Sequence, residues 1–418
     1  MEARIIANYL PQFHPIPEND KFWGKGFTEW TNVAKAKPFF KGHYQPRIPA
    51  DLGFYDLRLP EIREQQAQLA REAGVEGFCY WHYWFGNGKQ LLERPFQEVV
   101  ASGKPDFPFC LCWANHDWSN KSWKKDSKLD AMIAKQEYLG EKDHTEHFYS
   151  LLPAFKDHRY ITVDGKILFV IYDPYRFQGI EEFIQLWRKL AKDNGLKDFY
   201  FVAMCNNTTT IQRTEDGTLK RVLPNLKSSK EVYENLLKLG FDGLNSYGKS
   251  RAEMLSQGKW RRIISLYLHQ KFPWLPVQKY NYPKVVKYFF SPEDRWENIY
   301  PTILPQWDRT ARVGRKEGVY YNSTPENFKK HLKDALKIVD GRPLEHKILF
   351  LRSWNEWGEG NYVEPDLKYG HGFLDAIKEI EKFTRMCYIH DVAAIKKSVP
   401  DTHHIMRRGQ KWKTVSKF

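Results

Sequence analysis

The residues Ile167-Leu168-Phe169-Val170-Ile171-Tyr172 form a short apolar run, which is followed by an amphipathic stretch at Ile180–Asn194 that ends at Gly195. Such a run is typical of a strand whose two faces are both buried. A buried strand followed by an amphipathic helix is a βα unit, and βα units favour a parallel sheet.

The same unit recurs along the chain. Eight apolar runs are predicted to be strands, and they are Arg4–Tyr9, Gly77–Trp81, Phe107–Trp113, Ile167–Tyr172, Tyr200–Cys205, Gly243–Tyr247, Tyr300–Pro305 and Ile348–Ser353. Helices are predicted between or after them at Leu59–Ala73, His144–Phe155, Ile180–Asn194, Pro325–Asp340 and Gly370–Phe383. Eight strands with helices between them favour a closed (β/α)8 TIM barrel over a doubly wound sheet.

The barrel is predicted to occupy residues 1–385. Two long polar, basic or aromatic segments, Thr208–Lys230 and Lys249–Asn298, interrupt the alternation. We expect them to be insertions of loops and small helices on the active face, where connecting segments carry function. Residues 386–418 are predicted to be a basic C-terminal extension.

The formal net charge of +14 is unevenly distributed. Between Lys396 and Phe418 there are seven Lys and Arg residues against one acid, and Lys259-Trp260-Arg261-Arg262 is a second basic stretch. One interpretation is a solvated surface with a frayed tail. The other is attraction to an anionic membrane face or to an acidic glycan precursor. Nucleic acid is not expected as a partner, because no nucleic-acid module accompanies the charge.

The cysteines and the N-terminus indicate a compartment. Cys79, Cys110, Cys112 and Cys205 lie in strand-like apolar runs, so we expect buried free thiols in a reducing environment. Their spacing does not predict a zinc site, and no metal or cofactor is expected. The first residues run directly into a strand pattern without the apolar core of a signal peptide, and no run is long enough to span a membrane. A cytoplasmic location is expected, and the basic tail could act at the inner membrane face.

Polar and aromatic residues follow every predicted strand, which is where catalytic residues of such barrels gather. The aromatic share of 16% suits a cleft that stacks rings on sugar faces. The residues predicted to contact substrate are Tyr9, Gln12, His14, Glu29, Trp30, Trp81, His82, Trp113, Asn115, Asp117, Trp307, Trp354 and Asn355. For the histidines a structural role is an open alternative, and Asp117 could instead cap a helix.

The catalytic candidates lie in Trp354-Asn355-Glu356-Trp357-Gly358-Glu359-Gly360. Glycosidic chemistry needs one carboxylic acid at the exocyclic oxygen and a second carboxylate on the reacting face. In a helical turn, the spacing of three residues places Glu356 and Glu359 on one side. Two like charges at short range also raise one pKa, which a general acid requires near neutral pH.

Several motifs resemble the WbsX family of cell-surface polysaccharide biosynthesis proteins over roughly residues 4 to 385. They are Asn8-Tyr9-Leu10-Pro11-Gln12-Phe13-His14, the stretch from Trp23 to Trp30, Tyr80-Trp81-His82-Tyr83-Trp84-Phe85, Trp113-Ala114-Asn115-His116-Asp117-Trp118-Ser119 and the motif from Trp354 to Gly360. That family is commonly described as a glycosyltransferase and is similar to glycoside hydrolase family 99, the endo-α-mannosidases.

The second resemblance implies a retaining mechanism on a (β/α)8 barrel. By motif position, Glu356 would be the base that deprotonates the substrate's own 2-hydroxyl, and Glu359 would be the general acid and then the base. Tyr247, Asp308 and Arg312 resemble substrate-facing positions of that family. The N-terminal half is much more like WbsX, so the resemblance does not identify mannose as the substrate.

The sequence leaves three functions open. The first is a glycosyltransferase that builds a surface polysaccharide such as O-antigen or capsule from an oligosaccharide or glycan precursor. The second is a glycoside hydrolase that trims a glycan. The third is a non-catalytic glycan-binding barrel. No Asp-x-Asp motif for a nucleotide-sugar donor is present, and a lipid-linked donor near the membrane is compatible with the basic tail.

Overall fold

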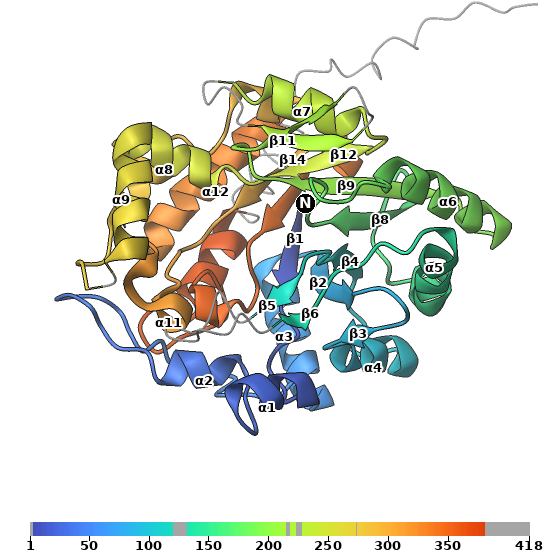
Figure 1. Ribbon diagram of the computed structural model, residues 1–418. Helices are drawn as coiled ribbons and strands as arrows, with labels where there is room; N and C mark the ends of the chain where they lie inside the picture. The colour runs from blue at the N-terminus through green and yellow to red at the C-terminus, as the bar shows by residue number, and fades with distance from the viewer. Residues whose placement is uncertain (1–2, 120–131, 215–217, 223–227, 273, 381–418) are drawn as a thin grey trace, which may run out of the picture.

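The computed structural model describes residues 3–119, 132–214, 218–222, 228–272 and 274–380, and it shows a central barrel of strands surrounded by helices (Figure 1). The predicted extension at 386–418 lies outside the described residues. Residues 372–380, within the last predicted helix, are helical.

Eight parallel strands form the barrel wall. They are β1 (Arg4–Tyr9), β2 (Gly77–Trp84), β4 (Phe109–Trp113), β8 (Lys166–Ile171), β9 (Phe199–Cys205), β12 (Gly243–Ser246), β14 (Ile299–Ile303) and β16 (Ile348–Leu351). Each strand pairs with the next, and β1 pairs with both β2 and β16, which closes the sheet. In that register Ile6 lies opposite Phe350 on one side and Gly77 on the other. The predicted (β/α)8 barrel is confirmed.

The helices lie around the outside of this wall and over its carboxyl end. They are α1 (Pro17–Trp23), α2 (Glu29–Ala34), α3 (Pro60–Ala73), α4 (Arg94–Ser102), α5 (Glu141–Phe155), α6 (Ile180–Asp193), α7 (Lys230–Leu237), α8 (Lys249–Gln257), α9 (Lys259–Lys271), α10 (Tyr282–Val286), α11 (Thr310–Val313) and α12 (Pro325–Val339). The predicted helices are found within a few residues of α3, α5, α6 and α12. The short helices α1, α2, α4 and α7 were not predicted.

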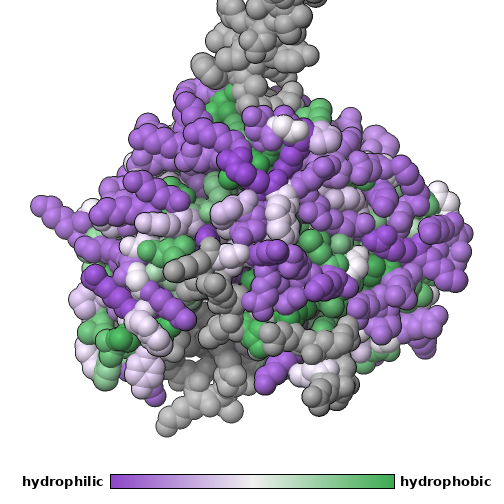
Figure 2. Space-filling model, turned by 90° about the horizontal axis from the view of Figure 1, so that it is seen from above, coloured by the Kyte–Doolittle hydropathy of each residue, from purple (hydrophilic) through white to green (hydrophobic). Residues whose placement is uncertain are grey.

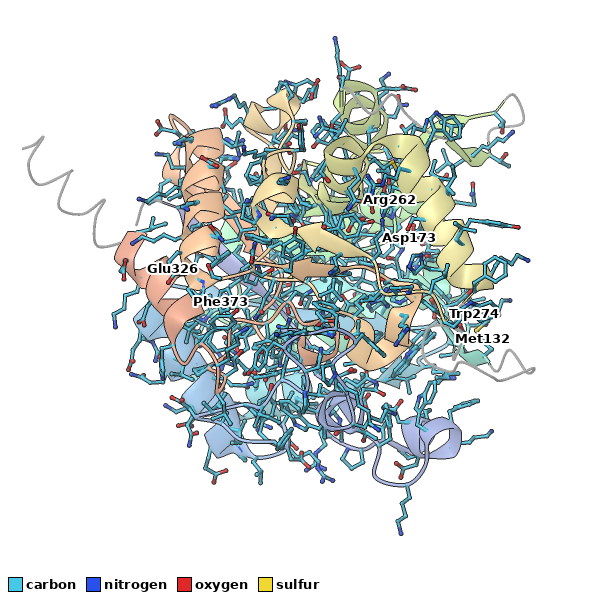
Figure 3. All side chains as sticks on the ribbon, turned by 90° about the vertical axis from the view of Figure 1, so that its left-hand side faces the viewer. Met132, Asp173, Arg262, Trp274, Glu326 and Phe373 are labelled. Atoms are coloured by element: carbon cyan, nitrogen blue, oxygen red, sulfur yellow. The ribbon has the colours of Figure 1, made fainter. Side chains whose placement is uncertain are left out.

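Local chemistry sets the ends of the predicted helices. Helix α3 ends because Gly74 adopts a left-handed conformation with φ 90°, and its N–H bonds back to the last turn. Helix α12 begins where the side chain of Thr324 accepts a hydrogen bond from Asn327 N. Figure 3 shows Glu326 of α12 near Phe373 of the 372–380 helix, and Phe328 of α12 contacts Phe373 with ring centroids 5.8 Å apart.

Short strands and 3-10 helices are added to the eight-stranded barrel. The strands β3 (Gln90–Leu91) and β7 (Thr162–Val163) run antiparallel to β2 and β8. Three further two-stranded pairs are β5 (Trp118–Ser119) with β6 (Met132–Ala134), β10 (Thr210–Arg213) with β11 (Leu219–Val222), and β13 (Lys279–Asn281) with β15 (Val319–Tyr321). The 3-10 helices are η2 (Pro292–Arg295), η3 (Gly314–Lys316), η4 (Leu344–His346) and η5 (Trp357–Glu359).

The two predicted insertions follow the carboxyl ends of β9 and β12, so they extend from the active face. The first contains the β10–β11 hairpin, which differs from the expected loops and small helices. The second contains the helices α8, α9 and α10 and agrees with the expectation.

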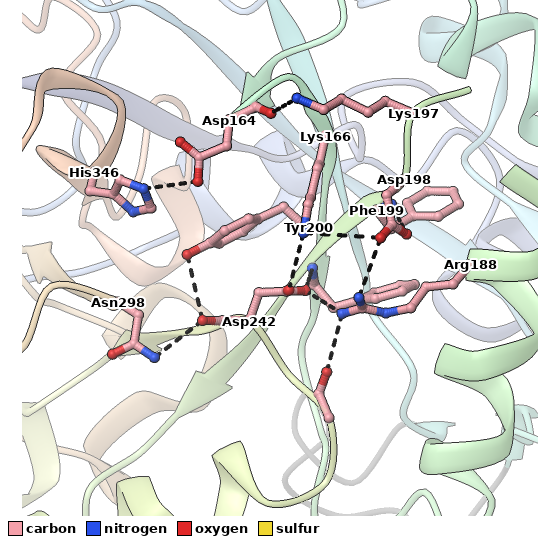
Figure 4. Close-up of polar contacts among 12 residues, drawn as sticks. Asp164, Lys166, Arg188, Lys197, Asp198, Phe199, Tyr200, Asp242, Asn298 and His346 are labelled. Atoms are coloured by element: carbon pink, nitrogen blue, oxygen red, sulfur yellow. Dashed lines mark hydrogen bonds and ion pairs between the residues drawn. The ribbon is translucent and has the colours of Figure 1, made fainter. Parts of the chain in front are cut away.

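The opposite, amino-terminal end of the barrel is held by ion pairs (Figure 4). Arg188 NH2 of α6 lies 2.7 Å from Asp242 Oδ2, and its NH1 lies 3.4 Å from Asp198 Oδ2. Lys166, at the start of β8, is 4.0 Å from both carboxylates. These contacts tie together the starts of β8, β9 and β12, and this end of a TIM barrel usually serves stability.

The interior and surface follow the expected partition. Cys79, Cys110, Cys112 and Cys205 are buried free thiols, as predicted. The face in Figure 2 is mostly hydrophilic with separate hydrophobic patches. In the part of the chain that the structure describes, no helix has both the length and the apolar content for crossing a membrane.

Candidate active site

The two candidate glutamates lie in the turn that follows the last barrel strand. After β16 the chain passes through Asn355 and enters the 3-10 helix η5, which contains Glu359. The Asn355 side chain accepts a hydrogen bond from Leu10 N (2.7 Å) and donates one to Leu10 O (3.0 Å). Ser353 Oγ accepts a hydrogen bond from Glu356 N (2.9 Å). The motif is therefore fixed to the carboxyl end of β1.

Both glutamates line a pocket of about 280 Å3 at the carboxyl ends of the strands. Its walls include aromatic side chains from several strand ends. Tyr83 stacks on Trp118 with ring centroids 5.7 Å apart, and Trp81 meets Tyr172 edge to face at 5.4 Å. Such rings suit the apolar faces of a sugar, with the two carboxyl groups beside them.

One guanidinium group holds both carboxyl groups. Arg312 NH1 lies 3.0 Å from Glu359 Oε1, and Arg312 NH2 pairs with Glu356 Oε1. The same side chain forms a bidentate pair with Glu29, through Nε at 2.8 Å and NH2 at 2.9 Å. Glu29 is completely buried at the start of α2, so this bidentate pair holds the Arg312 side chain in place. The two catalytic candidates are thus kept within the width of one guanidinium.

Gly358 makes this arrangement sterically feasible. A Cβ at this position would lie 1.8 Å from Glu29 Oε1 and 2.7 Å from Arg312 Nε. Any side chain here would displace the ion pair. The variable position of the motif is therefore glycine in this chain because the backbone lies directly on the Glu29–Arg312 pair.

The two glutamates have opposite pKa shifts. Burial raises the pKa of Glu356 to about 8; Arg312 opposes this, and the charges of Glu359 and Glu29 add to it. Burial also acts to raise the pKa of Glu359, but Arg309, Arg312 and Arg352 outweigh it and lower that pKa to about 2. These opposed shifts favour one proton on the pair at neutral pH, carried by Glu356. This resting distribution is the reverse of the one that the motif resemblance implies.

Six of the predicted residues line this pocket. They are Gln12, Trp81, Asp117, Arg312, Glu356 and Glu359. Asp117 lies at the exposed rim, where its carboxylate accepts a hydrogen bond from Gln136 N (2.9 Å).

Other predicted residues support the pocket from behind. Besides Glu29 and Asn355, Trp30 packs against Trp357 with ring centroids 5.4 Å apart and donates from Nε1 to Tyr55 O. Trp354 is fully buried and packs against Phe78 at 5.2 Å.

A second group faces away from the pocket, toward the helices. Alternate residues of a strand point to opposite faces, so His82 faces outward while its neighbours Trp81 and Tyr83 face the pocket. His82 Nε2 and His147 Nε2 of α5 lie 2.7 Å apart in a hydrogen bond, and Trp113 packs on the same His147 ring.

The last group also lies outside the lining. The Tyr9 hydroxyl donates to Gln66 Oε1 (2.6 Å), Asn115 Oδ1 accepts from Asp173 N, and His14 is buried. Asp308 is buried and accepts hydrogen bonds from His43 Nε2 and Gln45 Nε2, both at 2.8 Å. Trp307 lies under Lys249 Nζ at 4.0 Å, and the Tyr247 ring lies 4.6 Å from Arg352 Cζ.

Sequence reasoning did not single out eight lining residues, which are Leu10, Tyr83, Ala114, Trp118, Ser119, Tyr172, Arg309 and Arg352. His116, which the sequence offered either as a ligand of sugar hydroxyls or as a structural histidine, also lines the pocket. Most of the eight lie in strand-end segments that were recognised as polar and aromatic. Arg352 had a weak signal, a single charged residue directly after the apolar run of β16.

Two other cavities are larger than the glutamate pocket. One of about 780 Å3 is lined by Asp308, Lys279 and several tyrosines, and one of about 330 Å3 lies beside α4 and α5. Neither contains a pair of carboxyl groups with opposed pKa values, so we place the active site by chemistry rather than by volume. Within the described ranges, no group of three or more His, Cys, Asp or Glu side chains is arranged to hold a metal ion.

Comparisons with known proteins identify the family of this chain. A model of the family described as glycosyltransferase WbsX matches residues 5–377. The protein WxcX of Xanthomonas campestris pv. campestris (strain B100) is 31% identical over 381 residues, which are 91% of this chain and 50% of that protein. The chain thus spans about half the length of the curated relatives that it matches.

Two solved structures are similar in fold. One is a family 99 endo-α-mannosidase from Bacteroides thetaiotaomicron in complex with BIS-TRIS-propane, with a TM-score of 0.53 and 14% identity over 91% of this chain and 97% of the other. The second is a glycoside hydrolase-like protein with a TM-score of 0.53 and 13% identity over 90% and 93%. At these identities the likeness shows the fold.

Proposed function

The chain belongs to the WbsX glycosyltransferase family, and from this premise we propose that it forms or cleaves glycosidic bonds during the biosynthesis of a cell-surface polysaccharide. It is a carbohydrate-active enzyme, a glycosyltransferase or a glycoside hydrolase. The proposed substrate is an oligosaccharide or glycan precursor, and the proposed place of action is the cytoplasm at the inner membrane face.

The observation that carries the proposal is the pair of carboxyl groups on Arg312. Glu356 and Glu359 both contact the Arg312 guanidinium inside a ring-lined pocket. The pKa of Glu356 is raised to about 8 and that of Glu359 is lowered to about 2, so the two values lie on opposite sides of neutral pH. A retaining reaction needs one protonated and one ionised carboxyl group beside the same bond. The opposed pKa shifts of the two glutamates support this combination.

We assign the pair one shared proton, with the division of roles decided by substrate. Motif position makes Glu356 the base and Glu359 the acid and then the base. The field of Arg309, Arg312 and Arg352 instead favours the proton on Glu356 before substrate binds. For the motif-derived order, substrate binding must move the proton from Glu356 to Glu359.

Transfer and hydrolysis are separated by incubating the protein with mannose-, rhamnose- and fucose-containing oligosaccharides, with and without nucleotide sugars, and identifying products by mass spectrometry. Elongated products indicate a transferase, and shortened products indicate a hydrolase. Glu356→Gln and Glu359→Gln should each lower turnover at least about a hundredfold. Glu345→Gln, at the opposite end of the barrel, is the control and should leave turnover unchanged.

A leaving-group series then assigns the roles. For a substrate whose leaving group needs no proton, such as a dinitrophenyl glycoside, loss of the general acid spares the first step and slows only the second, whereas loss of the base slows the first step. The variant that still releases dinitrophenol in a rapid burst therefore identifies the acid. Near-normal turnover of both glutamine variants on all substrates, or oligosaccharide binding that neither variant changes and no turnover, would overturn the proposal.

A further inference from the structure

Arg352 is the one arginine lining the glutamate pocket that has no acidic partner among the described residues. Arg309 pairs with Glu317, and Arg312 pairs with Glu29. In the described parts of the chain no carboxylate lies within ion-pair distance of Arg352, and its side chain makes no hydrogen bond with them. The Arg352 side chain is partly exposed in the pocket, so a ligand bound there can reach its N–H groups.

The surroundings of Arg352 leave its hydrogen-bonding edge free. Its Cζ lies 4.6 Å from the ring centroid of Tyr247 and 5.7 Å from that of Trp81. Stacking on rings occupies the faces of a guanidinium but not its N–H fork. Gln12 Nε2, in the same pocket, and the Tyr247 hydroxyl are buried and have no hydrogen-bond partner among the residues that the structure describes.

The ion pairs around the glutamates support the same conclusion. Lys249, Arg262, Arg309 and Arg312 pair with Glu29, Glu253, Glu317 and Glu359. Arg352 forms no such pair among the described residues. Asp117, the other acid of the pocket, is exposed at its rim and bonded to Gln136 N.

We propose that the sugar bound in this pocket carries an anionic group, a carboxylate or a phosphate, and that Arg352 binds it. A guanidinium fork matches the two oxygens of either group. Gln12, which lines the same pocket, adds a neutral donor to the same anion. This inference rests on the proposed function, because it names the substrate class of the same site.

The test measures binding rather than turnover. Isothermal titration compares oligomers of galacturonic and glucuronic acid, and the 1-phosphates of galactose, glucose and mannose, each with its neutral parent sugar. One anionic set should bind at least about tenfold more tightly than its parent, and which set does so identifies the carboxylate or the phosphate. Arg352→Gln should remove the preference, Arg352→Lys should keep part of it, and Lys279→Gln, in the larger cavity, should leave it intact.

The absence of any anion preference in the wild-type chain, or its survival in Arg352→Gln, would overturn the inference. Repeating the titration with Glu356→Gln separates it from the proposed function, because that variant should lose turnover and retain the preference.

A different observation, on the outer surface, carries a second inference. Sixteen large hydrophobic residues are exposed in the described parts of the chain, and seven of them lie between residues 260 and 274. Four of these are more than half exposed, namely Trp260 (70%), Ile264 (55%), Tyr267 (58%) and Trp274 (70%). Trp274 lies at the edge of the molecule in Figure 3. Such a cluster on α9 and the loop after it indicates a contact surface rather than scattered exposure.

The charged residues of this surface are all basic. Lys259, Arg261 and Lys271 of α9 are exposed, and no Asp or Glu occurs between Glu253 and Glu293. A helix with bulky apolar residues and exposed cations is typical of the interface of an anionic bilayer. A second copy of this surface would instead bring like charges together.

We infer that α9 docks on an anionic lipid surface, with Trp260, Ile264 and Trp274 at the headgroup level. Arg315 NH1 of η3 donates to Trp274 O (3.1 Å), and η3 directly follows α11, which carries Arg312. The docking surface is therefore joined to the wall of the active site. Binding would bring the pocket close to the membrane plane.

Vesicle co-sedimentation of the full chain tests this inference, with phosphatidylglycerol–phosphatidylcholine vesicles against phosphatidylcholine alone. The wild type should prefer the anionic vesicles, and Trp260→Ser with Ile264→Ser and Trp274→Ser should weaken binding at least about tenfold. Lys259→Glu with Arg261→Glu should do the same. Tyr149→Ser, an exposed aromatic on α5, is the matched control.

Equal sedimentation of the wild type and both α9 variants would overturn the inference. So would light scattering that shows a wild-type dimer which the serine variant dissociates, because the surface would then be a protein interface.

Discussion

The substitution Gly358→Ala tests whether the Glu29–Arg312 pair positions the two glutamates. The new Cβ would lie 1.8 Å from Glu29 Oε1, whereas real Cβ contacts stay beyond 3.0 Å, so the carboxylate must move by at least the difference of 1.2 Å. Arg312 must follow Glu29, because they share two hydrogen bonds, and Arg312 holds both glutamates. A misplacement of about 1 Å in a catalytic group costs roughly a hundredfold in rate. We expect kcat/KM to fall by about that factor.

A measurement of stability and a control substitution at another glycine belong to this experiment. Overpacking costs about 1–3 kcal/mol, which thermal unfolding should register as a moderate loss in a folded protein. Gly358 has no positive φ, so alanine adds no backbone strain there. Gly179→Ala is the control, because its Cβ would have no neighbour closer than 3.9 Å. A folded Gly358→Ala protein with wild-type kcat/KM would show that the pair does not position the glutamates.

Three further predictions follow from the site and the barrel ends. The rate should fall as pH rises above about 8, because Glu356 then loses the proton that burial holds there; a kcat/KM profile that stays flat to pH 9.5 contradicts this assignment. Asn355→Ala should lower the free energy of unfolding by about 2–4 kcal/mol, because it leaves Leu10 N and O without partners; denaturant titration measures this loss, and an unchanged midpoint refutes it. Arg188→Met should cost about 1 kcal/mol in the same titration and leave turnover unchanged, because its partly exposed ion pairs lie at the far end of the barrel; lost turnover in a folded variant would contradict this separation.

The barrel could be predicted because its signal is local. Each strand is a run of consecutive apolar residues, as expected for a strand that is buried on both faces, and all eight predicted runs are barrel strands. The helices α1, α2, α4 and α7 were missed because they are too short to show a clear 3.6-residue period. Tertiary contacts rather than local propensity determine such short helices.

The site could be predicted only in part, because much of it depends on contacts between distant segments. Glu356 and Glu359 were found by spacing and flanking tryptophans. The pairing of Glu29 with Arg312 joins residues 283 positions apart, and nothing in either local segment indicates it. The outward direction of His82 was accessible from the two-residue period of a strand, once Trp81 was assigned to the pocket.

The ion pairs and hydrogen bonds at the seam of the barrel have a consequence for synthesis of the protein. Glu29 and Leu10 are translated early, yet their partners Arg312 and Asn355 emerge from the ribosome some 280 to 345 residues later. A nascent chain can form most of the barrel wall, since domains fold as their segments become available. Until translation nears its end, however, it lacks the Arg312 guanidinium and the strand β16 that closes the sheet. The glutamate pocket therefore cannot be complete before these last segments have been translated.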